Sequence, residues 1–237
     1  MFSDELQDVI DSLLGEACPD WTPPPRVDPA EDDADQRRYH RIEVTRFRLG
    51  RALAGQPDLT VRLSATILDA VLLEHSVSGR LTVPLITAVG RRAVLERLTG
   101  AVSEGPCQRR ANAAMGAYWV RCWRHPQERV LLRAARAKGA RSPEEFRSYL
   151  ARNLPPRPGG IDRIEDLWPR FWQACLTAFT ECDAEAQRLL QTAFPNEAAC
   201  YPPEFAGVLE QARRIAAADP ERFQEMLDRS TGYGYRI

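Results

Sequence analysis

A helical spacing of apolar residues runs through almost the whole chain and determines its fold class. From Gln36 onward, apolar side chains recur three and four residues apart, and no stretch shows the two-residue alternation of a half-buried strand. The chain is therefore predicted to be all-α. We expect helices over residues 37–54, 59–76, 80–90, 91–103, 107–124, 127–138, 143–152, 161–181, 184–193, 203–218 and 220–229.

Proline, glycine and small polar residues mark several helix ends. Ser142-Pro143-Glu144-Glu145 has the form of a capping box with proline at the first helical position. Asp219-Pro220 is expected to begin the last helix in the same way, and the proline- and glycine-rich run 154–160 predicts a break. Glycines at plausible helix stops are Gly55, Gly79, Gly105 and Gly139.

Charge is strongly segregated along the 237 residues, although the net charge is only −1. Residues 1–36 carry −10, residues 37–154 carry +13 and residues 155–237 carry −4, and 31 of the 32 basic residues are arginine. We therefore divide the chain into an acidic N-terminal arm, a basic helical domain and a C-terminal helical cap continuous with it. This layout favours an anionic partner, shielding by the arm, or both; the alternative is a solvated, unevenly charged surface.

The acidic arm combines two kinds of segment. Residues 3–15 read as a short amphipathic helix, and residues 18–35 as a proline-rich linker with an extended path. The helix either docks on the basic domain or reaches a partner, and docking is the simpler interpretation.

Two segments of the basic domain look alike. Residues 61–67 begin one expected helix, residues 108–114 begin another, and the offset is 47 residues, near the period of helical-pair repeats. An apolar helix at 92–102 is followed by Gly105-Pro106 and by an alanine-rich helix that opens with arginine.

This pattern resembles a HEAT-type repeat, best over residues 60–125. The resemblance implies antiparallel helical pairs stacked as an α-solenoid, because small residues let neighbouring helices approach closely. HEAT-like families include scaffolds, nucleic-acid binders and a few enzymes such as alkylpurine DNA glycosylases, but no residue pattern here matches a glycosylase site. The aromatic-rich segment 167–179 departs from the repeat pattern.

An arginine stripe is the first candidate binding site. Arg37, Arg41, Arg48 and Arg51 fall within about 80° on the helix expected at 37–54, and Ile42, Leu49 and Leu53 lie roughly opposite, toward the core. Guanidinium groups suit phosphate, sulfate and carboxylate ligands. The stripe is interpreted either as an anion site or as a solvated face paired with the acidic arm.

A second candidate site is a surface shared by two helices. Arg62, Thr66 and Asp69 share one helical face, and a second face carries Arg109, Asn112, Gly116, Trp119 and Trp123. If both line one groove, they would clamp an anion and stack a planar or apolar group. The alternative places Trp119 and Trp123 in the core and pairs Asp69 with Arg62.

A second arginine stripe and one histidine are weaker candidates for functional residues. A shorter stripe of Arg129, Arg133 and Arg136, with Arg121 and Arg124 nearby, extends the basic surface or is only solvated. His75 follows Glu74 and is a candidate acid or base, but adjacent helical residues point about 100° apart.

Metal and cofactor chemistry is not expected. None of the six cysteines forms a CxxC pair, and we expect mostly reduced thiols that pack as small apolar side chains. The motifs of P-loop, Rossmann, zinc-protease and α/β-hydrolase proteins are absent from the sequence. The acidic start and the lack of any apolar run of about 18 residues favour a soluble cytoplasmic protein without a membrane span.

Three functions remain open on the sequence. The first is a binding module whose arginine-rich surface holds an acidic carrier-type protein or nucleic acid. The second is a cofactor-independent enzyme of specialised metabolism, in which arginines hold a phosphorylated, sulfated or carrier-bound substrate and Asp69 or His75 moves a proton during elimination or ring closure. The third is a purely structural subunit whose acidic arm or aromatic C-terminal tail, residues 231–237, docks on another chain in a hetero- or homo-oligomer.

Overall fold

The computed structural model describes residues 4–28, 33–73, 79–123, 128–153, 164–194, 201 and 203–228. Every regular element in these ranges is helical, so the all-α prediction is confirmed. The elements are α1 (Asp4–Ala17), α2 (Ala34–Gly55), α3 (Pro57–Arg62), α4 (Ser64–Leu73), α5 (Gly79–Val89), α6 (Arg91–Ser103), α7 (Cys107–Cys122), α8 (Glu128–Ala137), α9 (Pro143–Asn153), α10 (Trp168–Glu181), α11 (Ala184–Leu190), η1 (Gln191–Ala193), η3 (Pro203–Phe205), α12 (Ala206–Ala217) and α13 (Gln224–Asp228).

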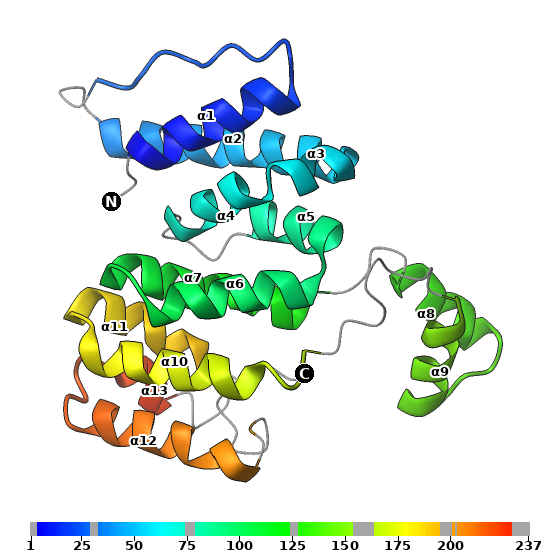
Figure 1. The fold of residues 1–237 in the computed structure, drawn as a ribbon, viewed down its shortest axis with the longest axis vertical. Helices are drawn as coiled ribbons and strands as arrows, with labels where there is room; N and C mark the ends of the chain where they lie inside the picture. Colours follow the sequence, from blue (N-terminus) through cyan, green and yellow to red (C-terminus); the bar gives the residue numbers. More distant parts are fainter. Residues whose placement is uncertain are drawn as a thin grey trace.

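Most of these helices pack on one another in chain order (Figure 1). Helix α1 packs against α2 and α4, and α2 continues the packing onto α5. The α6–α7 pair follows, with α4 and α5 against α7 on one side. On the other side, α10 packs against α6 and α11 against α7, and α12 and α13 close that end. We refer to these helices together as the stack.

One hydrophobic core runs through the stack from Leu6 to Met226. The side of α2 expected to face the core does so, because Ile42, Leu49 and Leu53 are almost completely buried. Helix α1 contributes to the same core with Leu6, Ile10, Leu13, Leu14 and Ala17. The N-terminal helix is therefore docked on the basic domain, as expected for an amphipathic helix with one continuous apolar face.

Helices α8 and α9 form a hairpin that lies beside the stack in Figure 1. They pack against each other, and no other described helix packs on them to a comparable extent. The predicted capping box at the start of α9 is confirmed. The Glu145 amide donates to the Ser142 hydroxyl over 3.1 Å, and the Ser142 amide donates to the Glu145 carboxylate over 2.9 Å.

The largest differences between the predicted and the observed helix bounds concern three helices. The helix expected at 59–76 is divided at Leu63 into α3 and α4, and the Thr60 hydroxyl donates to the Leu53 carbonyl, which ties α3 to the end of α2. Segment 61–67 therefore spans a break, whereas segment 108–114 lies within the continuous helix α7. Helix α10 begins at Trp168 rather than near 161, with proline in its first turn, and α13 begins at Gln224 because a turn follows Pro220.

Glycine and proline residues shape helix α5 and its close contact with α2. A single residue, Gly90, joins α5 to α6, and its φ of 92° is a conformation that favours glycine. Within α5, Pro84 lacks the N–H that would bond to the Arg80 carbonyl four residues earlier. That carbonyl faces α2 at Gly50, where a Cβ atom would lie only 2.5 Å from the Arg80 oxygen.

Across the described residues, no helix combines the length and the apolar character that a bilayer crossing requires.

Candidate functional site

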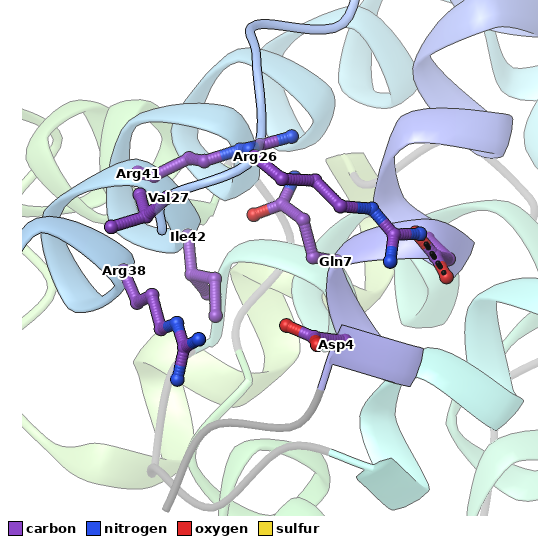
Figure 2. A pocket seen from close by; sticks show the side chains of 8 residues that line it. Asp4, Gln7, Arg26, Val27, Arg38, Arg41 and Ile42 are labelled. Atoms are coloured by element: carbon purple, nitrogen blue, oxygen red, sulfur yellow. Dashed lines mark hydrogen bonds and ion pairs between the residues drawn. The ribbon is translucent and has the colours of Figure 1, made fainter. Parts of the chain in front are cut away.

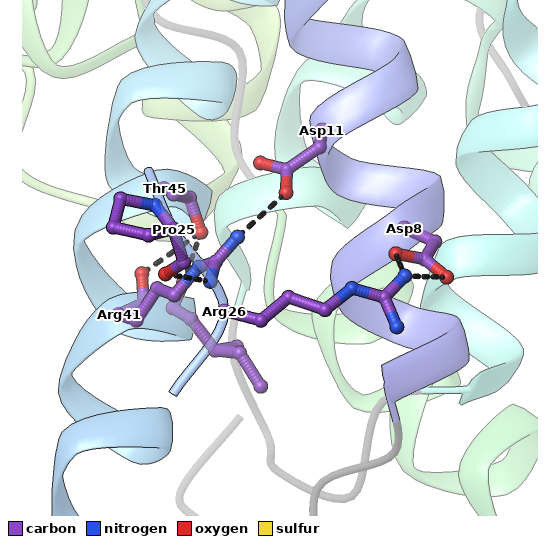
Figure 3. A network of polar contacts seen from close by, with 7 residues as sticks. Asp8, Asp11, Pro25, Arg26, Arg41 and Thr45 are labelled. Atoms are coloured by element: carbon purple, nitrogen blue, oxygen red, sulfur yellow. Dashed lines mark hydrogen bonds and ion pairs between the residues drawn. The ribbon is translucent and has the colours of Figure 1, made fainter. Parts of the chain in front are cut away.

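The predicted arginine stripe of α2 does not form one continuous surface. Arg41 is largely buried against α1, where it donates to Asp11 over 3.1 Å and to the Pro25 carbonyl over 2.7 Å (Figure 3). Pairing with the acidic N-terminal segment, the alternative interpretation of the stripe, therefore holds for Arg41. The guanidinium of Arg41 is occupied within the chain.

Residues 18–28, which we call the strap, follow α1 and run back along the α1–α2 surface. Arg26 of the strap pairs with Asp8 of α1 over 2.8 Å in an exposed ion pair (Figure 3). Trp21 of the strap lies under the guanidinium of Arg48, with 4.9 Å between the guanidinium carbon and the ring centroid. The strap thus contacts two of the four arginines of the predicted stripe.

A small polar cavity lies between the strap, α1 and α2 (Figure 2). Its volume of about 20 Å³ has room for about one water molecule. The buried amide of Gln7 lines this cavity and has no hydrogen-bond partner among the described residues. Arg26, Arg38 and Arg41 also line it, but each of them lies in an ion pair, with Asp8, Asp35 and Asp11 respectively. The cavity therefore suits a structural water rather than an anion.

The other side of α2 borders an open groove of about 710 Å³, formed with α5 and α7. Tyr39, Glu43, Phe47 and Arg51 stand four residues apart along α2 and form one wall. We call this site the α2–α5–α7 groove. Its other lining residues are Gly50, Ala54, Gly79, Arg80, Val83, Pro84 and Trp119.

Exposed aromatic rings give the groove its apolar character. Tyr39 is 48% exposed and Phe47 is 47% exposed, and both belong to the small set of large apolar side chains that the described surface leaves open. Trp119 is half-buried and packs edge-on against Tyr118, with ring centroids 5.3 Å apart. Gly79 makes this position of Trp119 possible, since a Cβ atom there would lie 2.7 Å from the indole ring.

The groove also carries an excess of positive charge. Glu43 contacts the fully buried guanidinium of Arg46 and lies 3.9 Å from Nε of Arg80. Arg80 stacks over the Phe47 ring at 4.8 Å, and exposed Arg51 lies further along the same wall. Because the groove is lined by one carboxylate and two guanidinium groups, those of Arg51 and Arg80, it has a net positive charge beside its aromatic rings.

The structure brings together two residues of the second predicted site, Asp69 and Arg109, and buries a third, Asn112. Asn112 is buried where α7 packs on α4, and it donates to the Leu72 carbonyl over 2.8 Å. Asp69 pairs with Arg109 over 2.9 Å, in an exposed ion pair, so the expected pairing of Asp69 with Arg62 is wrong. The helical face predicted from residue spacing does not reveal that α4 covers Asn112.

The tryptophans and remaining candidates have separate surroundings. Trp123 is buried, as one alternative expected, and its indole N–H donates to the Thr87 hydroxyl over 3.2 Å. Trp119 instead lines the α2–α5–α7 groove. Arg37 and Arg62 are exposed.

The basic hairpin and the candidate histidine are only partly described. Arg133 and Arg136 are exposed on α8, and Arg136 lies over the Phe146 ring at 5.7 Å. Arg121 lies over Tyr118 at 5.9 Å. Glu74, His75, Arg124 and the side chain of Arg129 lie outside the described residues.

One feature of the sequence, a helical row of two aromatic residues and an arginine, does point to the groove. Tyr39 and Phe47 are eight residues apart and share a helical face with Arg51, a spacing that places two rings and a guanidinium in one row. Arg80 and Trp119 join them only through the packing of α5 and α7 on α2, for which the sequence holds no local signal.

Comparisons with protein-family models, with curated proteins and with solved structures found no match to this chain. Within the described ranges, no group of three or more histidine, cysteine or acidic side chains is placed to hold a metal ion.

Proposed function

We propose that this chain is a HEAT-like α-solenoid binding module that holds an acidic, partly apolar segment of a partner protein in the α2–α5–α7 groove. The observation that carries the proposal is the row of exposed rings, Tyr39 and Phe47, beside the guanidinium groups of Arg51 and Arg80. Exposed apolar surface rimmed by charge is typical of interaction sites. Aromatic residues and arginine are also the residue types that dominate binding energy at interfaces.

The chemistry of the groove selects the kind of partner. Apolar side chains of a peptide would cover Tyr39, Phe47 and Trp119, and neighbouring carboxylates would pair with Arg51 and Arg80. Nucleic acid is a weaker fit, because its affinity depends on many phosphate contacts and the strap already engages Arg41 and Arg48. The partner we propose is therefore an acidic protein, and the part of it that binds is a segment combining carboxylates with apolar side chains.

The enzyme hypothesis gains no support from the described residues. Asp69, the proposed base, lies in an exposed ion pair with Arg109 and is not among the residues that line the groove. We therefore advance only the binding module.

A displayed library of random peptides tests the proposal while the natural partner is unidentified. The library is selected on the full chain and, in parallel, on Arg51→Glu. We expect wild-type selection to enrich peptides that combine acidic residues with aromatic or large aliphatic residues. Their dissociation constants should be roughly micromolar, and Arg51→Glu should weaken them about tenfold, the equivalent of about 1.4 kcal/mol.

A matched control separates a groove effect from a general charge effect. Arg133→Glu makes the same charge change on an exposed position of the α8–α9 hairpin, and it should leave peptide affinity within about twofold. Equal loss in both variants, or enrichment of basic peptides, would contradict the proposal. Binding of a mixed-sequence DNA duplex with a steep salt dependence, in place of peptide binding, would identify a nucleic-acid protein instead.

A further inference from the structure

Two halves of the stack meet across a long excursion of the chain. The chain leaves the stack after α7, passes through the α8–α9 hairpin and returns at α10. The contacts of α10 with α6 and of α11 with α7 therefore join segments that are far apart in sequence. Such a junction gains the most from a covalent link, because the link removes the freedom of a long loop in the unfolded chain.

Side chains from the start of α7 and the end of α10 meet at this junction. Arg110 is almost fully buried, donates to the Val102 carbonyl over 2.8 Å and pairs with Glu181 over 2.9 Å. Cys107 lies one turn before Arg110 on α7, and Cys182 directly follows Glu181. The ion pair therefore holds the two cysteines' segments together.

Cys107 and Cys182 flank the two ends of this ion pair, and the thiol of Cys107 is close enough to perturb the pKa of the Cys182 thiol. Cys182 is 6% exposed, whereas Cys107 is half-buried and so reachable from solvent. Burial and, to a smaller extent, the neighbouring Cys107 raise the pKa of the Cys182 thiol to about 12, although Arg110 acts in the opposite direction. An accessible thiol with a second thiol next to it shares one feature of redox-active cysteines, because the second thiol can resolve a sulfenic acid into a disulfide.

We propose that Cys107 and Cys182 form a disulfide when the protein meets a hydroperoxide. The Cys107 thiolate attacks one peroxide oxygen, the O–O bond breaks, and the hydroperoxide leaves as an alcohol, or as water in the case of hydrogen peroxide. Cys107 is then a sulfenic acid. The sulfur of Cys182 attacks the sulfur of Cys107, the S–O bond of the sulfenic acid breaks, and its hydroxyl leaves as water with the proton of the Cys182 thiol. The two thiols lose two electrons and the peroxide gains them.

Two of the other described cysteines, Cys122 and Cys175, serve as internal controls. Cys122 is exposed at the end of α7, and Cys175 is fully buried in the core, where burial raises the pKa of its thiol. The disulfide would close a loop of about 75 residues that contains the hairpin and would fasten α7 to α10. This inference does not depend on what the α2–α5–α7 groove binds.

The test treats the full chain with hydrogen peroxide, blocks the remaining thiols by alkylation and identifies linked peptides by mass spectrometry. We expect a Cys107–Cys182 linkage within one chain and a rise in Tm on the order of 5 °C that dithiothreitol reverses. Both signals should disappear in Cys107→Ser and persist in Cys122→Ser. Cys107→Ser alters a half-buried site, so a reduced protein with unchanged Tm confirms that this variant folds.

Three results would overturn the proposal. One is oxidation of Cys107 to sulfinic or sulfonic acid while Cys182 remains a free thiol. Another is a linkage found only between chains through Cys122. The third is an intact Tm rise in Cys107→Ser, which would assign the stabilisation to another pair of thiols.

Discussion

The two sides of α2 carry the same kind of residue in opposite states. On the strap side, Arg41 is held by Asp11 and the Pro25 carbonyl (Figure 3), and the guanidinium of Arg48 lies over the Trp21 ring. On the groove side, Arg51 and Arg80 lie beside exposed rings, with Glu43 as the carboxylate of that surface. Helical spacing groups arginines by the direction in which they point. The segments of the same chain that pack beside α2 determine which of these arginines can meet a partner.

The largest expected effect comes from removing the buried cation of the strap side. Arg41→Ala leaves Asp11 largely buried without its ion-pair partner, and one Asp11 oxygen already has no hydrogen bond within the described part of the chain. An uncompensated buried charge is costly, so we expect the free energy of unfolding to fall by about 2–4 kcal/mol. Denaturant unfolding measures this change.

Arg26→Ala is the matched control for that variant. It removes an arginine–aspartate pair from the same α1–strap surface, but both side chains of this pair are exposed. Exposed pairs contribute about 0–1 kcal/mol, so the loss should be below about 1 kcal/mol. Equal losses in Arg41→Ala and Arg26→Ala would show that burial does not distinguish the two pairs.

The next effect concerns the close approach that builds the groove wall. In Gly50→Ala the new methyl group would lie 2.5 Å from the Arg80 carbonyl oxygen, a backbone atom that moves only if α2 and α5 separate. We expect a loss of about 1–3 kcal/mol in unfolding free energy. Gly100→Ala, in α6 with no atom within 4 Å, should instead stabilise the protein by about 0.5–1 kcal/mol.

These glycine variants also test how stability and binding are linked. Because Gly50 sets the separation of α2 and α5, Gly50→Ala should weaken the peptides selected on the groove, and Gly100→Ala should not. A stable Gly50→Ala variant with unchanged peptide affinity would show that the groove does not depend on this contact.

The smallest expected effect is at the edge of the strap. Arg48→Ala removes the guanidinium over Trp21, and an exposed cation–π contact contributes about 0.5–1 kcal/mol. We expect a loss of that size in thermal unfolding and a change in Trp21 fluorescence, measured against a Trp21→Phe background. A loss above about 2 kcal/mol would mean that the strap contributes more than its visible contacts indicate.

Local features of the fold were predictable from the sequence. The bounds 91–103 of α6 and the capping box of α9 agree with the structure, because periodicity and capping act within a few residues. Neither the break at Leu63 nor the bond from the Thr60 hydroxyl to the Leu53 carbonyl was predictable. The apolar spacing alone gave no sign of that bond.

The candidate sites were predictable only in part. The four arginines of the predicted stripe do lie on one helix, α2. The strap contacts to Arg41 and Arg48 could not be predicted, because they join residues that are far apart in sequence. Asn112 shares a helical face with Trp119, yet α4 buries Asn112 and α5 leaves Trp119 at the groove. Tertiary packing, which a single sequence does not display, separated residues that helical geometry had grouped together.

One pair of variants tests the central difference between the two sides of α2. Arg48→Glu and Arg51→Glu make the same charge change three residues apart on one helix, the first on the strap side and the second on the groove side. Fluorescence polarisation measures the affinity of the selected acidic peptide for each variant, and circular dichroism confirms that both fold. We expect Arg51→Glu to weaken binding about tenfold and Arg48→Glu to change it by less than about twofold. Equal weakening, or a larger loss in Arg48→Glu, would contradict the assignment of the α2–α5–α7 groove as the binding surface.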